Sequence, residues 1–432
     1  MLRRSFLLGA GSAALGSAPT AWSAEGTLGR IAFLQRDGLW IRSLPTGKPE
    51  RLIGGTGLDS PRFSPTGKWI GYFQDDVYYV VSCGGGSKIR MGKPDGGDHG
   101  AQWAVGRDEL LVNGPAGLRV FTSANGWSQA IQEIRNASLP IVFSPDGKDI
   151  VYGDVVNAGR GPGAEPVRTG RLCRMAVDQA SSVPKVLVSK SNAGLSPCAW
   201  TGVDQILFWD DPDFSASFAA DGLELFRIPA AGGTPQSMGV STLVHHDMLS
   251  LSPDQTHFAV SAGNGRDTWE GKRIAILNVN TEAVSYLTDE RIAAVCPAWS
   301  PRGDRIAFAA APSPPAGAGA GGGPPAKRLL GRRRIWIGGV SPASAPNLLT
   351  SDERYRDEEP MWSADGRLIL FGRIDSGNNK TLWLTAVGSG SLLQVAGPLD
   401  AKSGLPGGDD GWFGYYGYID WRSMVDWYRG AG

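Results

Sequence analysis

The sequence of 432 residues lacks the marks of several large protein classes. It has four cysteines, Cys83, Cys173, Cys198 and Cys296, whose spacing matches no zinc site and forms no Cys-x-x-Cys pair, although an oxidising compartment would permit disulfides. Basic and acidic residues number 42 each, and this balance gives no field that attracts nucleic acid. Beyond the N-terminal region no run of 18 apolar residues occurs, so we expect a soluble mature protein.

Turn-forming residues, by contrast, are abundant. The chain has 61 glycines and 29 prolines, spread along its length rather than gathered in one block, and 15 tryptophans. Such a composition favours many short strands joined by tight turns and disfavours a helical bundle.

Residues 1–24 read as an export signal. Arg3-Arg4-Ser5-Phe6-Leu7 precedes a short apolar stretch, and Ala21-Trp22-Ser23 is a small-x-small cleavage site. This pattern predicts twin-arginine export to the periplasm, with an ordinary secretory signal as the alternative. No cysteine follows the apolar stretch, so we expect no lipid anchor.

One short pattern recurs along the chain: an aromatic residue, Ser-Pro, a glycine turn and an apolar run. The clearest copies are Ser60–Tyr72, Ile141–Tyr152, Pro297–Phe308 and Pro360–Phe371. The aromatic position forms a column of Phe63, Trp103, Phe143, Trp200, Leu251, Trp299 and Trp362, with gaps of 40 to 63 residues. Each unit reads as four short antiparallel strands, which is typical of a β-propeller blade. We interpret the column as packing between blades.

The two ends of the chain supply one more blade. Residues 30–33, 39–41 and 50–53 read as second, third and fourth strands without a first. Tyr418–Ser423 reads as a first strand with nothing after it, and it adds Trp421 to the column. We therefore predict an all-β fold, a single propeller over residues 25–432. It has eight four-stranded blades, or seven if the Leu251 or Trp103 unit is incomplete, and the C-terminal strand closes the ring.

The run Trp299-Ser300-Pro301, then Gly303, then Ile306-Ala307-Phe308, resembles the WD40-like (PD40) repeat of TolB-type periplasmic propellers. An eight-bladed ring of such repeats is also similar to the propeller of dipeptidyl-peptidase IV-type enzymes. Those enzymes add a hydrolase domain. No Gly-x-Ser-x-Gly nucleophile motif occurs in this chain, so a serine peptidase is not expected.

Propeller geometry indicates where a site should lie. The longest insertions, residues 154–171, 210–222, 262–272 and 311–333, connect strands on one face, which we call the insertion face. The Ser-Pro-Gly turns lie on the other, the turn face. Polar residues near the start of each first strand should surround the channel mouth on the insertion face. These candidate binding residues are Asp59, Asp98, His99, His246, Asp247, Asp357, Glu358, Asp409, Asp410 and Trp412.

Three histidines in this region, His99, His245 and His246, are candidate ligands for a divalent metal. Structural capping by the same side chains is the competing interpretation, and no other cofactor is predicted. The Pro/Gly-rich insertion 311–334 should be flexible. Its basic run 327–334 would either contact an anionic polysaccharide or lipid headgroup or remain a solvated loop.

These observations favour a monomeric, non-enzymatic scaffold that binds a protein or another envelope component through the insertion face. The alternative is a metal-dependent, lyase-like carbohydrate-active enzyme with its site at the channel mouth. The fold by itself does not decide between them.

Overall fold

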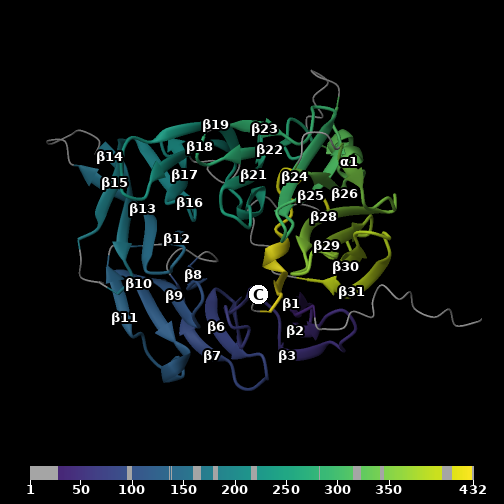
Figure 1. Cartoon of the computed structure of the whole chain (residues 1–432). Coiled ribbons are helices and arrows are strands. Elements are labelled where there is room, and N and C mark those ends of the chain that lie inside the picture. Colours follow the sequence, from purple (N-terminus) through teal and green to yellow (C-terminus); the bar gives the residue numbers. More distant parts are fainter. Residues whose placement is uncertain are drawn as a thin grey trace, which may run out of the picture.

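The computed structural model describes residues 28–94, 100–135, 137, 139–158, 167–178, 183–215, 221–281, 283–314, 323–340, 345–400 and 411–430. Its strands form antiparallel sheets arranged around a ring, with the first strand of each sheet innermost (Figure 1). The predicted β-propeller is therefore confirmed. The N-terminal signal, residues 1–24, lies outside the described residues.

The described strands make eight blades of four, in chain order. Blade 1 contains β32 (Val425–Tyr428), β1 (Arg30–Gln35), β2 (Gly38–Ser43) and β3 (Glu50–Gly54). Blade 2 contains β4 (Leu58–Phe63), β5 (Trp69–Gln74), β6 (Val77–Ser82) and β7 (Ile89–Gly92). Blade 3 contains β8 (Ala101–Trp103), β9 (Glu109–Gly114), β10 (Gly117–Thr122) and β11 (Gln132–Arg135). Blade 4 contains β12 (Ile141–Phe143), β13 (Asp149–Ala158), β14 (Val167–Ala176) and β15 (Lys185–Ser191).

The second half of the ring follows the same plan. Blade 5 contains β16 (Ala193–Trp200), β17 (Gln205–Pro212), β18 (Gly222–Pro229) and β19 (Gln236–Leu243). Blade 6 contains β20 (Leu249–Leu251), β21 (His257–Ala262), β22 (Arg273–Asn278) and β23 (Val284–Tyr286). Blade 7 contains β24 (Ile292–Trp299), β25 (Arg305–Pro312), β26 (Arg334–Gly339) and β27 (Asn347–Leu348). Blade 8 contains β28 (Tyr355–Trp362), β29 (Leu368–Asp375), β30 (Lys380–Ala386) and β31 (Leu392–Leu399). The helical segments are α1 (Gly323–Leu330), η3 (Ser123–Asn125), η4 (His246–Met248) and η5 (Trp421–Ser423).

The repeat units that contain Trp103 and Leu251 each form a complete four-stranded blade, so the described strands make eight blades rather than seven. In blades 2 to 8 the column residue is the last residue of the innermost strand. The predicted closing strand was wrong in position. Residues 418–420 are not in a strand and Trp421 begins η5, whereas β32 pairs antiparallel with β1 from Arg30–Tyr428 to Phe33–Val425. Tyr428 therefore takes the column position of blade 1, and its ring centroid lies 5.7 Å from that of Phe63.

The repeated turn has a simple hydrogen-bond basis, seen clearly after Trp362. Ser363 Oγ accepts from the Leu368 amide at 3.0 Å and donates to the Asp365 carboxylate at 2.6 Å. The Gly366 amide donates to the Ser363 carbonyl, and Gly366 adopts φ 69°, a left-handed conformation that favours glycine. The same serine-centred bonds recur after Phe143, so the sequence pattern encodes one turn geometry.

The hydrophobic core is divided among the spaces between neighbouring blades. Eight buried clusters each join residues of two adjacent blades, and together they run round the whole ring. The cluster between blades 8 and 1, for example, unites Leu370 and Leu382 with Phe33 and Trp427. Closure thus involves packing on both sides of blade 1 as well as the β1–β32 pairing.

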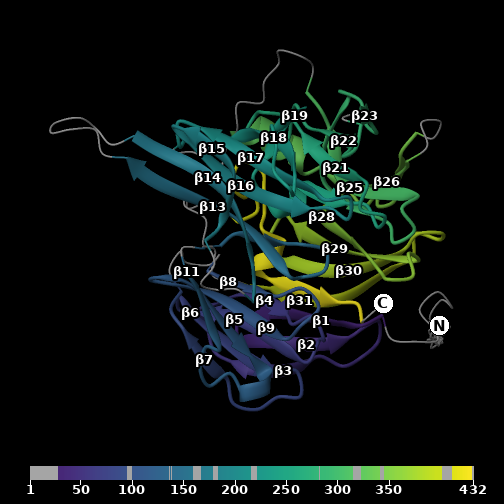
Figure 2. The same cartoon turned by 60° about the vertical axis from the view of Figure 1, so that its left-hand side comes forward.

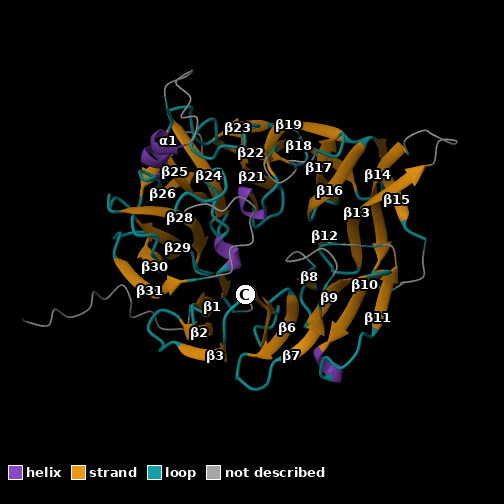
Figure 3. Cartoon of the chain, turned by 180° about the vertical axis from the view of Figure 1, so that it is seen from behind, coloured by secondary structure: helices purple, strands orange, loops and turns teal. Residues whose placement is uncertain are grey.

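The centre of the ring holds two short helices, η4 and η5, which Figure 3 shows inside the circle of blades. Trp421, the first residue of η5, is buried against blade 8. A Cβ at Gly372 would lie 2.5 Å from its indole ring, so only glycine leaves room for it. On the outside, the β13–β14 hairpin projects from the ring (Figure 2).

All four cysteines are free thiols. Among the helices of the described residues, none has the length and apolar character needed to cross a bilayer.

We expect that ending the chain after Met424 will destabilise the propeller. The truncation removes the buried side chains of Val425 and Trp427 and leaves β1 as an open edge. Burial of two such side chains contributes about 3–6 kcal/mol. Denaturant unfolding of the two chains should show this loss, whereas removing only Gly430–Gly432 should change stability by less than about 0.5 kcal/mol. Equal stability of the two truncated chains would contradict the proposed closure.

Candidate functional site

The insertion face is more ordered than the composition of residues 311–334 suggests. Residues 315–322 lie outside the described part, but 323–330 form α1, and Arg333 and Arg334 are buried. The prediction of a flexible loop over 323–334 was therefore wrong, and two members of the basic run are internal. Much of the expected insertion 154–171 is also strand, since Asp154 pairs with Arg171 in the β13–β14 ladder.

Three insertions meet in one apolar cluster, which we call the insertion platform. It contains Trp269, Ala326 and Leu330, with Leu329, Trp412, Phe413 and Tyr416 packed against them. Trp269 comes from the β21–β22 connection, the alanine and leucines from α1, and the last three from the segment before β32. Packing joins these segments into one surface at the channel mouth.

Beneath the platform, two buried arginines enclose one buried glutamate. Glu358 accepts from Arg333 Nη1 at 2.6 Å and from Arg356 Nε at 2.5 Å, and Trp421 Nε1 donates to its other oxygen at 3.2 Å. Burial alone would raise the pKa of Glu358, but the two guanidinium groups lower it below its usual value. Burial in turn lowers the pKa of Arg356 to about 10, although Glu358 opposes this effect.

The remaining donors of the two arginines bind the backbone. Arg333 donates to the carbonyls of Thr268 at 2.7 Å and Gly417 at 3.2 Å, and Arg356 donates to the carbonyls of Trp412 and Gly417. Gly417 has φ 81°, and a Cβ there would lie 2.4 Å from Thr268 Oγ1. These bonds fix the segment before β32 across the channel mouth.

The predicted binding residues occupy different settings. Asp357 is fully buried in a bidentate pair with Arg373, at 2.7 and 3.0 Å, and Glu358 is bound as described. Asp59 is buried beside Ser60, whose hydroxyl donates to it at 3.3 Å. His246 is exposed, and the neighbouring His245 stacks on Tyr418 with ring centroids 4.0 Å apart. Asp98, His99, Asp409 and Asp410 lie outside the described residues.

Trp412 lines a groove on the insertion face. The other lining residues are Lys327 of α1 and Ser376, Gly377 and Asn378 of the β29–β30 turn, and the space measures about 410 Å³. Lys327, Arg328 and Arg332 are exposed on this side. An indole ring beside an amide and basic groups suits an anionic ligand with a flat or apolar face.

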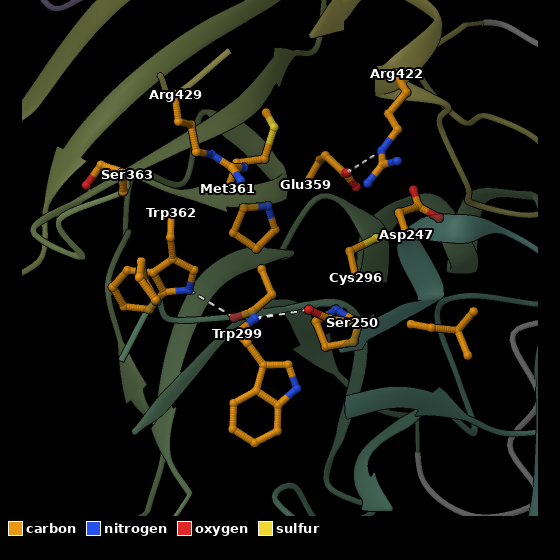
Figure 4. A pocket seen from close by; sticks show the side chains of 16 residues that line it. Asp247, Ser250, Cys296, Trp299, Glu359, Met361, Trp362, Ser363, Arg422 and Arg429 are labelled. Carbon is orange, nitrogen blue, oxygen red and sulfur yellow. Dashed lines mark hydrogen bonds and ion pairs between the residues drawn. The ribbon is translucent and has the colours of Figure 1, made fainter. Parts of the chain in front are cut away.

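A second cavity, of about 430 Å³, lies on the turn side of blades 6, 7 and 8. Its apolar wall includes Trp299, Met361 and Trp362, and it extends to the Ser-Pro turns at Pro301 and Ser363. At one end it reaches three buried side chains, Asp247, Cys296 and Glu359 (Figure 4). We call these three residues the acidic cluster.

The acidic cluster is short of hydrogen-bond partners. Both carboxylate oxygens of Asp247 and Oε2 of Glu359 are buried and receive no hydrogen bond from other described residues, so the two carboxyl groups depend on a hydrogen bond to each other. Arg422 Nε, 3.9 Å from Glu359 Oε1, is a nearby cation, and its own side chain is 48% exposed. Burial, followed by the charge of Glu359, raises the pKa of Asp247 well above its usual value, and burial raises the pKa of Glu359. Both shifts favour a proton on the pair, whose two carboxyl groups titrate together.

Only Asp247 of this cluster was singled out from the sequence. Cys296 and Glu359 each stand three residues before a column tryptophan and directly before a proline. Both have positive φ, 54° and 48°, and both lie where the ladder register shifts. A β-bulge of this kind redirects a side chain. An X-Pro step three residues before the column was thus the available signal.

Scans against models of known protein families and against curated protein sequences gave no match. Solved structures do resemble the chain. An eukaryotic initiation factor shares 10% identity over 86% of this chain and 96% of its own, with a TM-score of 0.51. A protein assigned as dipeptidyl aminopeptidase IV from Bacteroides ovatus shares 12% identity over 86% of this chain, with a TM-score of 0.50; this chain covers 59% of its length.

A protein described as TolB from Agrobacterium tumefaciens is also similar, with 15% identity over 85% of this chain and 88% of its own and a TM-score of 0.38. The chain is a β-propeller by its strand order, and its structural neighbours include proteins described as TolB and as dipeptidyl aminopeptidase IV. At these identities the likeness concerns the fold alone.

We expect the double substitution D247N and E359Q to stabilise the metal-free protein above neutral pH. A carboxyl group with a raised folded-state pKa loses its proton later than in the unfolded chain, so wild-type stability falls as pH rises from about 4 through the folded pKa. The variant should lose this slope and be more stable than wild type at pH 8. Denaturant unfolding with a chelator present measures both effects.

Asp289→Asn is the control, because the ion pair of Asp289 with Arg291 is exposed. It should change stability by no more than about 1 kcal/mol. A double variant that is less stable than wild type at pH 8 would contradict the shared-proton interpretation.

Proposed function

We propose that this protein is an exported periplasmic scaffold that binds a protein or another envelope component on its insertion face. The insertion platform carries this proposal, because three loops far apart in sequence are packed into one surface beside a groove. Binding surfaces built from loops on a fixed scaffold follow this principle.

The charge of the groove favours an anionic ligand. Lys327 lines it, and Arg328 and Arg332 are exposed on the same helix and the turn that follows. Arg333 and Arg334 do not contribute, since they are buried beneath the platform. The ligand would therefore contact the first part of the basic run and the ring of Trp412.

We expect the pair of substitutions W412A and K327E to weaken binding through this groove. Envelope extracts and defined anionic polysaccharides or vesicles can be tested with each purified variant. Loss of an aromatic anchor and reversal of a charge should weaken binding at least about tenfold, or 1.4 kcal/mol. The matched control is Lys148→Glu, an exposed lysine beside a Ser-Pro turn on the opposite face. Equal binding by both variants would overturn the proposal.

Export is tested separately. Replacing Arg3 and Arg4 by lysine should stop export through the twin-arginine route, which requires both arginines, and the protein should accumulate in the cytoplasm with its signal uncleaved. Cell fractionation measures this outcome. Unchanged export would instead favour an ordinary secretory signal.

The enzymatic alternative depends on a metal. Within the part of the chain that the structure describes, the histidines do not join a group of three or more metal-ligating side chains, whereas the acidic cluster does. A metal site built on the histidines, as the sequence suggested, would therefore need His99, which lies outside the described residues.

A further inference from the structure

Three side chains with metal-ligating atoms converge at the end of the turn-side cavity. The ligand atoms of Asp247, Cys296 and Glu359 all lie within 4.8 Å of one another. Asp247 comes from η4, Cys296 from β24 and Glu359 from β28, so residues of three successive repeats meet at one point. Figure 4 shows the three at the same end of the cavity.

The local backbone is shaped to bring two of these side chains here. Cys296 and Glu359 hold left-handed conformations, which are costly for residues other than glycine, and each is followed by proline. A regular strand would avoid this cost. Ser60 of blade 2 shows the same departure before Pro61, so the bulge belongs to the repeat. In blades 7 and 8 it carries metal-ligating side chains and directs them to one point.

The carboxyl groups of the cluster receive no donor from elsewhere in the described residues. The two oxygens of Asp247 and Oε2 of Glu359 are buried, and a proton held between the two carboxyl groups is the hydrogen bond open to them; Asp247 is only 6% exposed. Buried carboxyl groups that rely on one another in this way cost free energy in the empty protein. A cation placed between them would satisfy all three.

We propose that Asp247, Cys296 and Glu359 bind one divalent metal ion of the zinc class, with one coordination position open to the cavity. A thiol among the ligands favours zinc or cobalt over magnesium and calcium, which prefer oxygen ligands alone. Three protein ligands beside an open space are typical of a metal that also binds water or a small ligand. This site is independent of the groove on the insertion face.

The site lies among other charged groups, and a cation bound there would replace protons on its ligands. The other charged or titratable groups facing the cluster are Asp420, Arg422, Glu358, Arg333 and Tyr418, with His245 stacked on Tyr418.

The test uses the whole purified protein, stripped with a chelator and titrated with Zn²⁺ or Co²⁺ alone. We expect one ion per chain and, with Co²⁺, a thiolate-to-metal charge-transfer band. C296S should remove the band, and D247N with E359Q should raise the dissociation constant at least about 100-fold. C198S is the matched control. Burial raises the pKa of Cys198 and no charged side chain contributes to the shift, so this variant should retain the band.

Folding and metal binding are distinguishable in these variants. Denaturant unfolding without metal is measured for each variant, and a variant that unfolds like wild type but has lost the site has lost its ligands rather than its fold. Absence of stoichiometric binding by the wild-type protein, or a band that survives C296S, would overturn the proposal.

Proton release gives a second readout. Calorimetry of Zn²⁺ binding in two buffers of different ionisation enthalpy should show proton release near neutral pH, because the Cys296 thiol must lose its proton to ligate the ion. The affinity should accordingly fall as pH falls. Release of no protons would overturn binding through the Cys296 thiolate.

Discussion

The pairing of Glu358 with Arg333 and Arg356 governs the centre of this molecule. Two guanidinium groups buried beside one carboxylate have more donors than that carboxylate can accept. The remaining donors require backbone carbonyls, and residues 411–417 supply them together with Thr268. Separating one partner of such a group costs about 3–5 kcal/mol, so the terminal segment is held across the channel mouth before it enters β32.

Two adjacent glutamates, Glu358 and Glu359, point into different parts of the interior. Glu358 lies beneath the insertion platform, where two guanidinium groups lower its pKa. Glu359, turned by the bulge, lies in the turn-side cavity beside Asp247, and its pKa is raised. The interior of the ring therefore holds one region where arginines lower the pKa of a carboxyl group and another where burial raises it.

The repeat predicted the fold because it depends on local interactions. The Ser-Pro-Gly turn and the column residue are set by hydrogen bonds within about six residues, as at Ser363, and these reveal themselves in sequence. The closing strand was misplaced because Tyr418–Trp421 carries aromatic residues like a first strand. Its path is decided instead by arginines of two other blades, which the sequence does not connect to it.

The same reason limited the prediction of the site. Glu358 and Asp357, four and five residues before Trp362, form ion pairs with buried arginines. Those arginines, Arg333, Arg356 and Arg373, come close to them only in the folded ring. In blades 7 and 8 the residue three positions before the column tryptophan is a potential metal ligand, Cys296 or Glu359, and Oε2 of Glu359 is buried without a donor from other described residues.

The two structural neighbours with TM-scores of 0.50 and 0.51 share this fold at 12% and 10% identity, so their activities do not transfer with it. The specific features of this chain are the helices η4 and η5 at the centre of its ring, its insertion platform and its acidic cluster. Because the insertion platform and the acidic cluster draw on different residues and open to different faces, a variant at one should leave the other intact. Function can therefore be assigned to each face independently, and a metal on the turn side would neither require nor preclude a partner on the insertion side.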